Sequence, residues 1–240
     1  MHRSAPRLTR ILACAAVPVM LVAAGCSSDS DSGKTSGSDS SSSATSQAGK
    51  KVAAVDPAKY AKLPDPCKTI SAKTITQLVP ETKAKGGTTG KSSDTTSRGS
   101  CSWNGLDDDG VKGSQYRWLD VAFLRYDSEQ SLGASGQQRA EDNYAKEIAK
   151  AQATEGAKSV RTSPAGGVGE AATAIGYELK KTGEDFTYAT IVTRTGNVVI
   201  TLTYNGTGYA GAKSPASADL VKGAVTAAKE AAAAVGVANK

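Results

Sequence analysis

The chain has 240 residues, of which 39% are hydrophobic and 5% aromatic, and it carries 29 Lys and Arg against 23 Asp and Glu. This length fits one domain or a small pair with tails, and the modest hydrophobic content indicates that part of the chain lies outside any core. The one histidine, His2, lies in a segment that we expect to be cleaved off. A mature chain without imidazole excludes a Ser-His-Asp triad, a Cys-His catalytic pair and a His-ligated metal site.

The first segment has the pattern of an export signal. An apolar run covers residues 11–25 and follows three arginines, while the first acidic residue is Asp29. A basic start and an apolar stretch of this length predict a secretory signal peptide over residues 1–25, because a bilayer span needs about 20 apolar residues. The run ends in Ala23-Ala24-Gly25-Cys26, which resembles a bacterial lipobox. That resemblance implies cleavage before Cys26 and its acylation, palmitate included; the alternative is ordinary secretion with Cys26 as a free thiol.

The segment after the leader is predicted to be a tether. Loss of residues 1–25 removes three Arg and no acid, which lowers the formal charge from +6 to +3. No cluster of Lys and Arg remains, so we expect no binding to nucleic acid. In residues 27–49, 16 of 23 positions are Ser, Thr or Gly. Such a composition buries too little surface to offset chain entropy, so residues 26–60 are expected to form a disordered tether with a reach of roughly 30 Å.

Residues 61–240 are expected to form a single globular domain. Ser71 can cap a short helix that runs to Val79, and residues 83–100 have the Gly, Ser and Thr content of a long loop. A strand is predicted to open at residues 101–103 and to be followed by a turn at 107–110. The next strand, 115–126, carries apolar residues on both faces, which is typical of a central strand. Helical spacing and a capping box then predict a helix over residues 136–153.

The C-terminal half alternates apolar and polar residues with period two. Three such runs, near residues 175–180, 186–192 and 198–204, are joined by turns at 183–185 and at Gly196-Asn197. They predict an antiparallel meander, and an Ala-rich helix is predicted to follow over residues 219–235. The fold class is therefore α+β: an antiparallel sheet of about five strands packed with two to three helices.

Four cysteines reduce to two in the predicted domain. Cys14 leaves with the leader and Cys26 is used for the lipid, so Cys67 and Cys101 remain. An even count outside the cell predicts a disulfide between them. Reactive thiols are the alternative, but the chain has neither CxxC spacing nor a mature His that would lower a thiol pKa.

Two motifs resemble ligand sites and have simpler interpretations. Residues 167–172 match G-x-G-x-x-A, a dinucleotide-binding pattern that requires a strand before it and a helix after it. Here a strand pattern follows, so we expect a tight turn and no cofactor. The Asp107-Asp108-Asp109-Gly110 run lacks the alternating acids and the final Glu of a Ca²⁺ loop, so we expect a solvated turn and no metal.

Two acids and a group of aromatic residues are the remaining candidates. A His-free hydrolase could use a pair of carboxylates, for which Asp120, in an apolar strand, and Glu170, after the glycine turn, are candidates. A structural role for each acid is the alternative. Four aromatic residues lie close to one predicted strand and could form either a ligand pocket or the core: Trp103, Tyr116, Trp118 and Tyr126.

An ordered set of short motifs resembles a family of actinobacterial surface lipoproteins that carry a domain of unknown function. The motifs are Asp65-Pro66-Cys67, Cys101-Ser102-Trp103, Gly167–Ala171, Thr195–Val199 and the closing Ala-rich helix. The likeness spans about residues 63–235. It implies structural cysteines and a fold similar to PsbP/Mog1-like α/β/α sandwiches, and it provides no catalytic residue.

These features predict a lipoprotein on the extracytoplasmic face of the cell membrane. We expect a non-catalytic binding or scaffold domain whose partner is an envelope protein, a wall glycan or an apolar ligand. The alternatives are a carboxylate-dependent envelope hydrolase and a carrier of an apolar ligand, which requires a cavity of roughly 300 Å³ or more.

Overall fold

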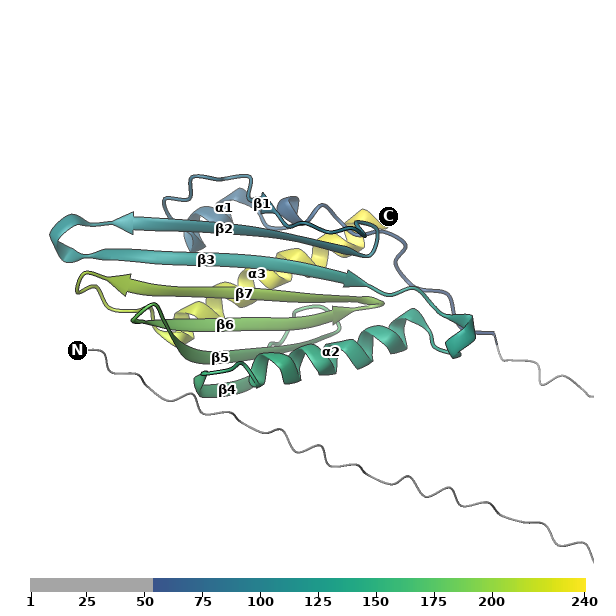
Figure 1. Cartoon of the computed structure of the whole chain (residues 1–240). Coiled ribbons are helices and arrows are strands. Elements are labelled where there is room, and N and C mark those ends of the chain that lie inside the picture. The colour runs from purple at the N-terminus through teal and green to yellow at the C-terminus, as the bar shows by residue number, and fades with distance from the viewer. Residues whose placement is uncertain (1–53) are drawn as a thin grey trace, which may run out of the picture. The chain divides into compact units, whose positions relative to one another are not determined.

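The computed structural model describes residues 54–240 (Figure 1). The predicted leader, the lipidation site Cys26 and the tether as far as residue 53 lie outside the described residues. The strands are β1 Thr88–Thr89, β2 Arg98–Asp108, β3 Ser114–Arg125, β4 Lys158–Pro164, β5 Ala171–Lys181, β6 Glu184–Thr195 and β7 Val198–Tyr209. The helices are α1 Ala72–Leu78, α2 Gly136–Gln152 and α3 Ser217–Ala238, with short 3-10 turns at Pro66–Lys68, Gly110–Lys112 and Gln130–Leu132.

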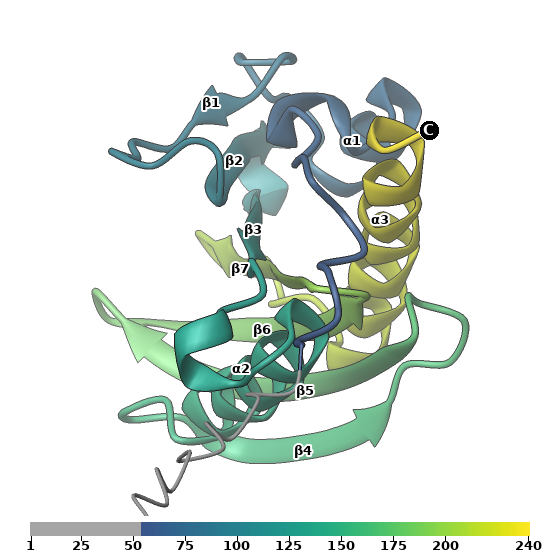
Figure 2. The same cartoon turned by 90° about the vertical axis from the view of Figure 1, so that its right-hand side faces the viewer.

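The strands form one antiparallel sheet in the order β1-β2-β3-β7-β6-β5-β4. This confirms the α+β class, the C-terminal meander and the central place of β3, while the strand count is seven rather than about five. The two unpredicted strands are the edges of the sheet, β1 and β4. Figure 2 shows the sheet twisting from β1–β3 at the top to β4 at the bottom, the usual consequence of right-handed strand twist.

Helix α3 covers one face of the sheet. Ala224, Ala227, Ala228 and Ala231 along this helix are completely buried, and they pack in the same core cluster as Leu119, Val121 and Phe123 of β3. Small side chains let the helix backbone approach the strands closely, which explains why an Ala-rich sequence forms this layer. Helix α1 and the residue that follows it add Ile75 and Val79 to the same core. The N-cap of α1 is the predicted Ser71, whose side chain accepts a hydrogen bond from the Thr74 amide.

Helix α2 lies on the opposite face, in front of the sheet in Figure 1. Its cap is Ser135, whose side chain accepts a hydrogen bond from the Gln138 amide, as the capping-box pattern predicts. Ala140 of this helix is buried in a second cluster with Ile175, Val192 and other side chains of β5, β6 and β7. The sheet is therefore covered by helices on both sides over its C-terminal half.

Two asparagine side chains, those of the buried Asn197 and the half-buried Asn239, hold the start of the described chain against the domain. Asn197 Oδ1 accepts from the Tyr60 amide at 2.7 Å, and its Nδ2 donates to the carbonyl oxygens of Tyr60 and Tyr126. Asn239 acts in the same way: its Oδ1 accepts from the amides of Ala61 and Lys62, and its Nδ2 donates to the carbonyl oxygen of Lys62. Hydrogen bonds to the domain therefore begin at or before Tyr60. The sequence predicts the boundary between tether and domain slightly later, at residue 61.

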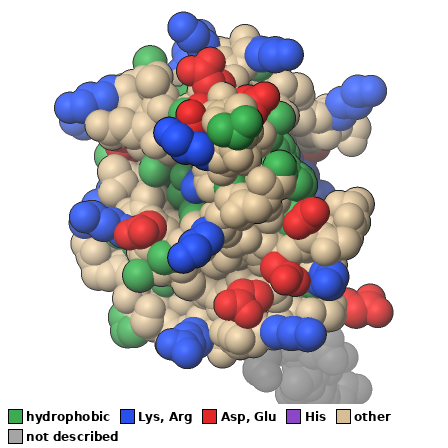
Figure 3. Space-filling model, turned by 90° about the vertical axis from the view of Figure 1, so that its left-hand side faces the viewer, with side chains coloured by type: hydrophobic (Ala, Val, Ile, Leu, Met, Phe, Trp, Pro, Cys, Tyr) green, Lys and Arg blue, Asp and Glu red, His purple; other side chains and the backbone are tan. Residues whose placement is uncertain are grey.

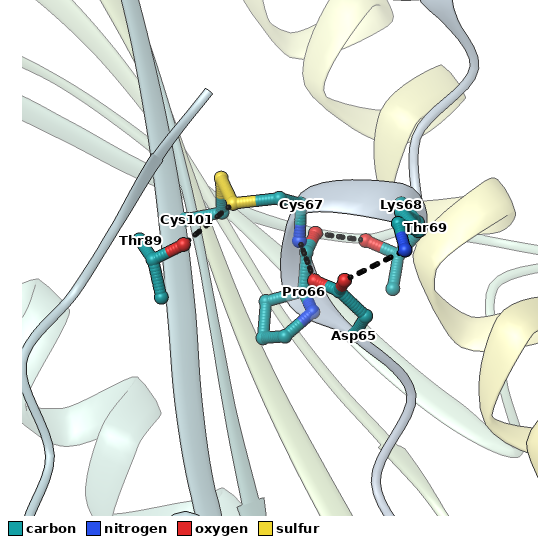
Figure 4. The surroundings of a disulfide bond; sticks show 7 residues. All are labelled: Asp65, Pro66, Cys67, Lys68, Thr69, Thr89 and Cys101. Atoms are coloured by element: carbon teal, nitrogen blue, oxygen red, sulfur yellow. Dashed lines mark hydrogen bonds and ion pairs between the residues drawn. A yellow bond between two sulfur atoms is a disulfide. The ribbon is translucent and has the colours of Figure 1, made fainter. Parts of the chain in front are cut away.

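The predicted disulfide joins Cys67 to Cys101, with a Cα–Cα distance of 5.1 Å and a sequence separation of 34. It ties the 3-10 turn Pro66–Lys68 to β2, as Figure 4 shows. The Asp65 carboxylate accepts a hydrogen bond from the Cys67 amide at 3.0 Å and fixes this turn. Among the described residues, no helix combines the length and apolar character that a membrane crossing requires.

Candidate functional site

The sheet has an open half on the face that carries α2. Helix α2 packs over β5, β6 and β7, and in Figure 1 β2 and β3 face the viewer with no helix in front of them. Alternate residues of β3 show the difference: Leu119 and Val121 on the α3 face are completely buried, whereas Trp118 and Asp120 on the open face are half-buried. The open half therefore presents side chains of β2, β3 and β7 to solvent.

An aromatic cleft of about 500 Å³ lies at one end of this open half. We call it the aromatic cleft; its lining residues are Tyr116, Trp118, Lys181, Thr182, Phe186, Tyr188, Asn205 and Tyr209. Five of these are aromatic, out of the twelve Phe, Trp and Tyr residues in the chain. The rings support one another, since Tyr116 meets Phe186 edge to face and Tyr188 stacks on Tyr177 with centroids 4.9 Å apart.

Asn205 forms the floor of the aromatic cleft. It lies on β7 opposite Trp118 of β3 and opposite Tyr188 of β6. Its side chain is 2% exposed, and no hydrogen-bond partner for its Nδ2 occurs in the described part of the chain. A buried donor without a partner costs about 1–3 kcal/mol of stability, so a ligand acceptor that reached Nδ2 would recover this free energy.

Asp120 lies on the open half of the sheet beside the aromatic cleft, one cross-strand row of residues away from Trp118 and Asn205. Its register partners are Ser102 on β2 and Thr203 on β7, and it is two residues from Trp118 on the same strand. Burial raises the pKa of the Asp120 carboxyl from 3.8 to about 6, and no hydrogen bond or opposite charge offsets this effect. The carboxylate is therefore a second polar group on this face that lacks a partner within residues 54–240.

Glu170 lies elsewhere. Lys59 Nζ is 2.8 Å from its Oε1 and Arg194 Nη1 is 2.9 Å from its Oε2. Burial opposes ionisation, but the hydrogen bond and positive charge of Lys59, together with Arg194, hold the pKa of Glu170 below its ordinary value of 4.5. This carboxylate fixes the start of the described chain to the β6–β7 turn.

The two candidate carboxylates do not form a pair. Asp120 is on β3 and Glu170 directly precedes β5, and β7 and β6 lie between these strands. At about 4.8 Å per strand, the two acids are separated by at least ~14 Å, whereas paired glycosidase carboxylates lie about 5–9.5 Å apart. The structure therefore does not bring these two residues together.

The G-x-G-x-x-A motif at residues 167–172 and the acidic run that begins at Asp107 contribute to connections between strands. Gly167 and Gly169 have φ angles of 74° and 56°, and the segment continues directly into β5, so no helix start is available for a dinucleotide phosphate. Asp108 accepts hydrogen bonds from the Gly110 amide and the Ser114 hydroxyl in the β2–β3 connection. Among the residues that the structure describes, no group of three or more His, Cys, Asp or Glu could hold a metal ion.

The aromatic residues singled out in the sequence divide between three places. Trp103 is 1% exposed in the core cluster to which α1 and α3 contribute, and Tyr126 lies against the Arg139 guanidinium. Tyr116 and Trp118 line the aromatic cleft, with Phe186, Tyr188 and Tyr209 from β6 and β7. The last three could not be grouped with β3 from the sequence, because β7 inserts beside β3 only in the folded sheet.

Charged side chains show no segregation by sign at this end of the domain. Figure 3 views the molecule from the end that carries the β2–β3 connection, and Lys and Arg side chains are interspersed there with Asp and Glu. Lys181 is the cationic residue that lines the aromatic cleft, with its Nζ 5.5 Å from the centre of the Tyr188 ring.

The profile of a family described as "Protein of unknown function (DUF3558)" matches residues 21–175 of the chain. The chain belongs to the DUF3558 family. The matched part of this DUF3558 protein ends within β5, so Tyr116, Trp118 and Asp120 lie inside it, whereas Asn205 lies beyond it. The family assignment agrees with the predicted relation to a lipoprotein family with a domain of unknown function.

Two further comparisons add little to the DUF3558 assignment. A crystal structure of LpqN, described as involved in cell envelope biogenesis of Mycobacterium tuberculosis, matches with a TM-score of 0.29 and 16% sequence identity. The match covers 54% of this chain and 68% of LpqN, and at this level of similarity it carries no argument about fold or role. No curated protein matches the chain.

Proposed function

We propose that this DUF3558 protein is a lipid-anchored, extracytoplasmic binding protein without enzymatic activity. The acyl chains on Cys26 hold it at the cell membrane, the Ser-rich tether separates the domain from the lipid, and the open half of the sheet binds a ligand of the envelope. The observation that carries this proposal is the aromatic cleft, which combines five aromatic side chains with a buried amide donor that lacks a partner.

The chemistry of the cysteines supports an extracytoplasmic location. The Cys67–Cys101 disulfide is the form that cysteines take in an oxidising compartment. The leader pattern of residues 1–25 would supply the route to that compartment, and the small residues before Cys26 resemble those of a lipobox. Two or more acyl chains are sufficient for stable anchoring, at about 0.8 kcal/mol for each buried CH₂ group.

The arrangement of the carboxylates supports binding over hydrolysis by the predicted pair. Glu170 is engaged by Lys59 and Arg194, and two strands separate it from Asp120. Asp120 instead lies beside the aromatic cleft with a free carboxylate, where it can accept hydrogen bonds from a ligand.

Metabolic labelling tests the anchor. The full chain is produced in a bacterial host that processes lipoproteins and is grown with an alkyne-tagged fatty acid. We expect the label on the wild-type chain and on a Cys14→Ser control, because Cys14 leaves with the leader, and no label on Cys26→Ser. An unlabelled wild-type chain, or a labelled Cys26→Ser chain, would contradict the anchor.

A second candidate function is carriage of an apolar ligand, which an apolar groove favours. The groove measures about 610 Å³ beside the C-terminal part of α3, where its walls include Pro64, Ala233, Ala234 and Val237, and Val237 is 66% exposed. We expect a fluorescent fatty acid to bind in this groove of the wild-type chain, and we expect its affinity to fall in the Val237→Glu variant. If binding of the probe is absent or insensitive to this substitution, the carrier candidate fails.

A further inference from the structure

We infer that the aromatic cleft is a saccharide site in which Asn205 hydrogen-bonds sugar hydroxyls, together with Asp120 beside the cleft. This inference rests on the proposed function, because it names the ligand class of the same site. It assigns the aromatic rings to stacking against a sugar ring and the two polar groups without partners to recognition of its hydroxyl or acetamido groups.

The side chains of the cleft match the two surfaces of a sugar. One face of a pyranose ring consists of C–H groups with a slight positive charge, and the face of an aromatic ring carries negative charge, so the two surfaces attract. The rim of a sugar consists of hydroxyl groups, which both donate and accept. Tyr116, Trp118 and Tyr209 are half-buried in the cleft wall, and the amide of Asn205 is a donor at its floor.

The cross-strand row that contains Asp120 lies next to the aromatic cleft and extends the site beyond one sugar unit. Two residues along a strand advance it by about 6.6 Å, so Asp120 lies next to the row of Trp118 and Asn205 on the same face. Its register partners Ser102 and Thr203 are hydroxyl side chains. An oligosaccharide that stacks in the aromatic cleft therefore reaches a carboxylate flanked by hydroxyl groups.

Other ligand classes fit these residues less well. An apolar ligand would cover the half-buried Asp120 without providing a hydrogen bond, which penalises its burial, and it would leave the buried Asn205 Nδ2 without an acceptor. A polyanion would place its charge beside the Asp120 carboxylate. A peptide strand could not pair with β3, because both edges of this strand are already bonded, to β2 and to β7.

Isothermal titration of the full chain carrying Cys26→Ser tests the inference. The probes are the N-acetylglucosamine trimer, maltotriose and, for the apolar class, decanoate. We expect saturable binding of at least one trisaccharide, with a Kd that rises at least tenfold in Asn205→Leu and in Tyr209→Ala. Tyr126→Ala is the matched control and keeps the wild-type Kd, since Tyr126 is a half-buried aromatic residue outside the cleft.

A denaturation midpoint for each variant shows whether it folds. Leu at position 205 removes the donor without a partner, so this variant is expected to unfold at the same or a higher denaturant concentration than wild type while its binding is lost. If Asn205→Leu does not fold, Tyr209→Ala and the conservative Asn205→Thr carry the test.

The outcomes separate this inference from the proposed function. Absence of binding for both trisaccharides, or binding that the cleft variants leave unchanged, overturns the saccharide site. Decanoate binding that Tyr209→Ala weakens, without trisaccharide binding, overturns the saccharide site and leaves the cleft as a binding site. The metabolic-labelling experiment on Cys26 uses none of these three probes, so its result tests the lipid anchor separately from the saccharide site.

Discussion

Asp120→Asn should stabilise the protein at neutral pH and have almost no effect at acidic pH. The wild-type carboxyl has a pKa near 6 in the folded chain because it is desolvated, against 3.8 in the unfolded chain. A group whose pKa is raised on folding, and whose charged form is the deprotonated one, destabilises the fold wherever it is ionised. The penalty is absent below pH 3.8, grows between pH 3.8 and about 6, and is constant above that range.

The magnitude follows from the two pKa values. The interval from 3.8 to about 6 corresponds to about 3 kcal/mol of unfolding free energy as an upper limit. Because the side chain is half-buried and meets some solvent, and because Asn is itself polar, we expect a gain of about 1–2 kcal/mol at pH 7.5. At pH 3.5 the carboxyl is protonated in the folded chain and mostly protonated in the unfolded chain, so the gain approaches zero.

Urea denaturation at pH 3.5 and pH 7.5 measures this difference directly. Each variant is compared with wild type at the same pH, so the titration of all other groups cancels. Asp107→Asn is the control, since Asp107 is an exposed carboxylate at the end of β2. Equal gains for Asp120→Asn at the two pH values, or no gain at pH 7.5, would refute the assignment of the penalty to desolvation.

Three further substitutions test the packing and the links of the domain. Replacing Cys67 and Cys101 by Ala opens a link across 34 positions and should lower the unfolding free energy by about 3–4 kcal/mol; a chain whose stability is insensitive to reductant would contradict this. Glu170→Gln removes the ion pairs with Lys59 and Arg194 and should cost up to about 1 kcal/mol at pH 7, because the Glu170 side chain is 39% exposed. The lowered pKa of Glu170 makes that cost disappear as the pH falls below 4.5, which urea titrations at pH 3 and pH 7 resolve. Ala231→Leu should cost about 1–3 kcal/mol by overpacking under α3, and wild-type stability in thermal denaturation would show that α3 does not pack tightly.

Local signals in the sequence were sufficient for most of the fold. Ser71 caps the helix that the sequence predicts after it, Ser135 caps the helix predicted from the capping box, and Gly196-Asn197 forms the turn between two strands of the meander. These features depend on hydrogen bonds or backbone angles within a few residues. Because the physical cause is local, the sequence pattern records it.

The two edge strands, β1 and β4, could not be predicted because they carry no local sequence signal of a strand. All seven residues of β4, Lys158–Pro164, are exposed, so no alternation of apolar and polar residues marks the strand. Its pairing with β5 shifts register between Lys158 and Arg161, and it ends in a proline. These are features that protect a sheet edge against further pairing, and they also remove the usual strand signal.

The candidate site shows the limit of reasoning from sequence. The sequence pattern predicts that Tyr116 and Trp118 are neighbours on one strand, but Asn205 carries no local pattern that distinguishes it. It joins them because β7 lies between β3 and β6, an order that depends on long-range packing. In the same way, the sequence offers Asp120 and Glu170 as two carboxylates that could pair, whereas the strand order separates them.

The side-chain amide of Asn205 provides the most direct test of the binding site. In a two-dimensional ¹⁵N spectrum of the full chain carrying Cys26→Ser, the Asn205 NH₂ pair is identified by its loss in Asn205→Leu. The account predicts that this pair shifts and saturates as the N-acetylglucosamine trimer or maltotriose is added, together with the Trp118 indole NH and without the buried Trp103 indole NH. An Asn205 amide that stays unchanged at saturating concentrations of both sugars would contradict it.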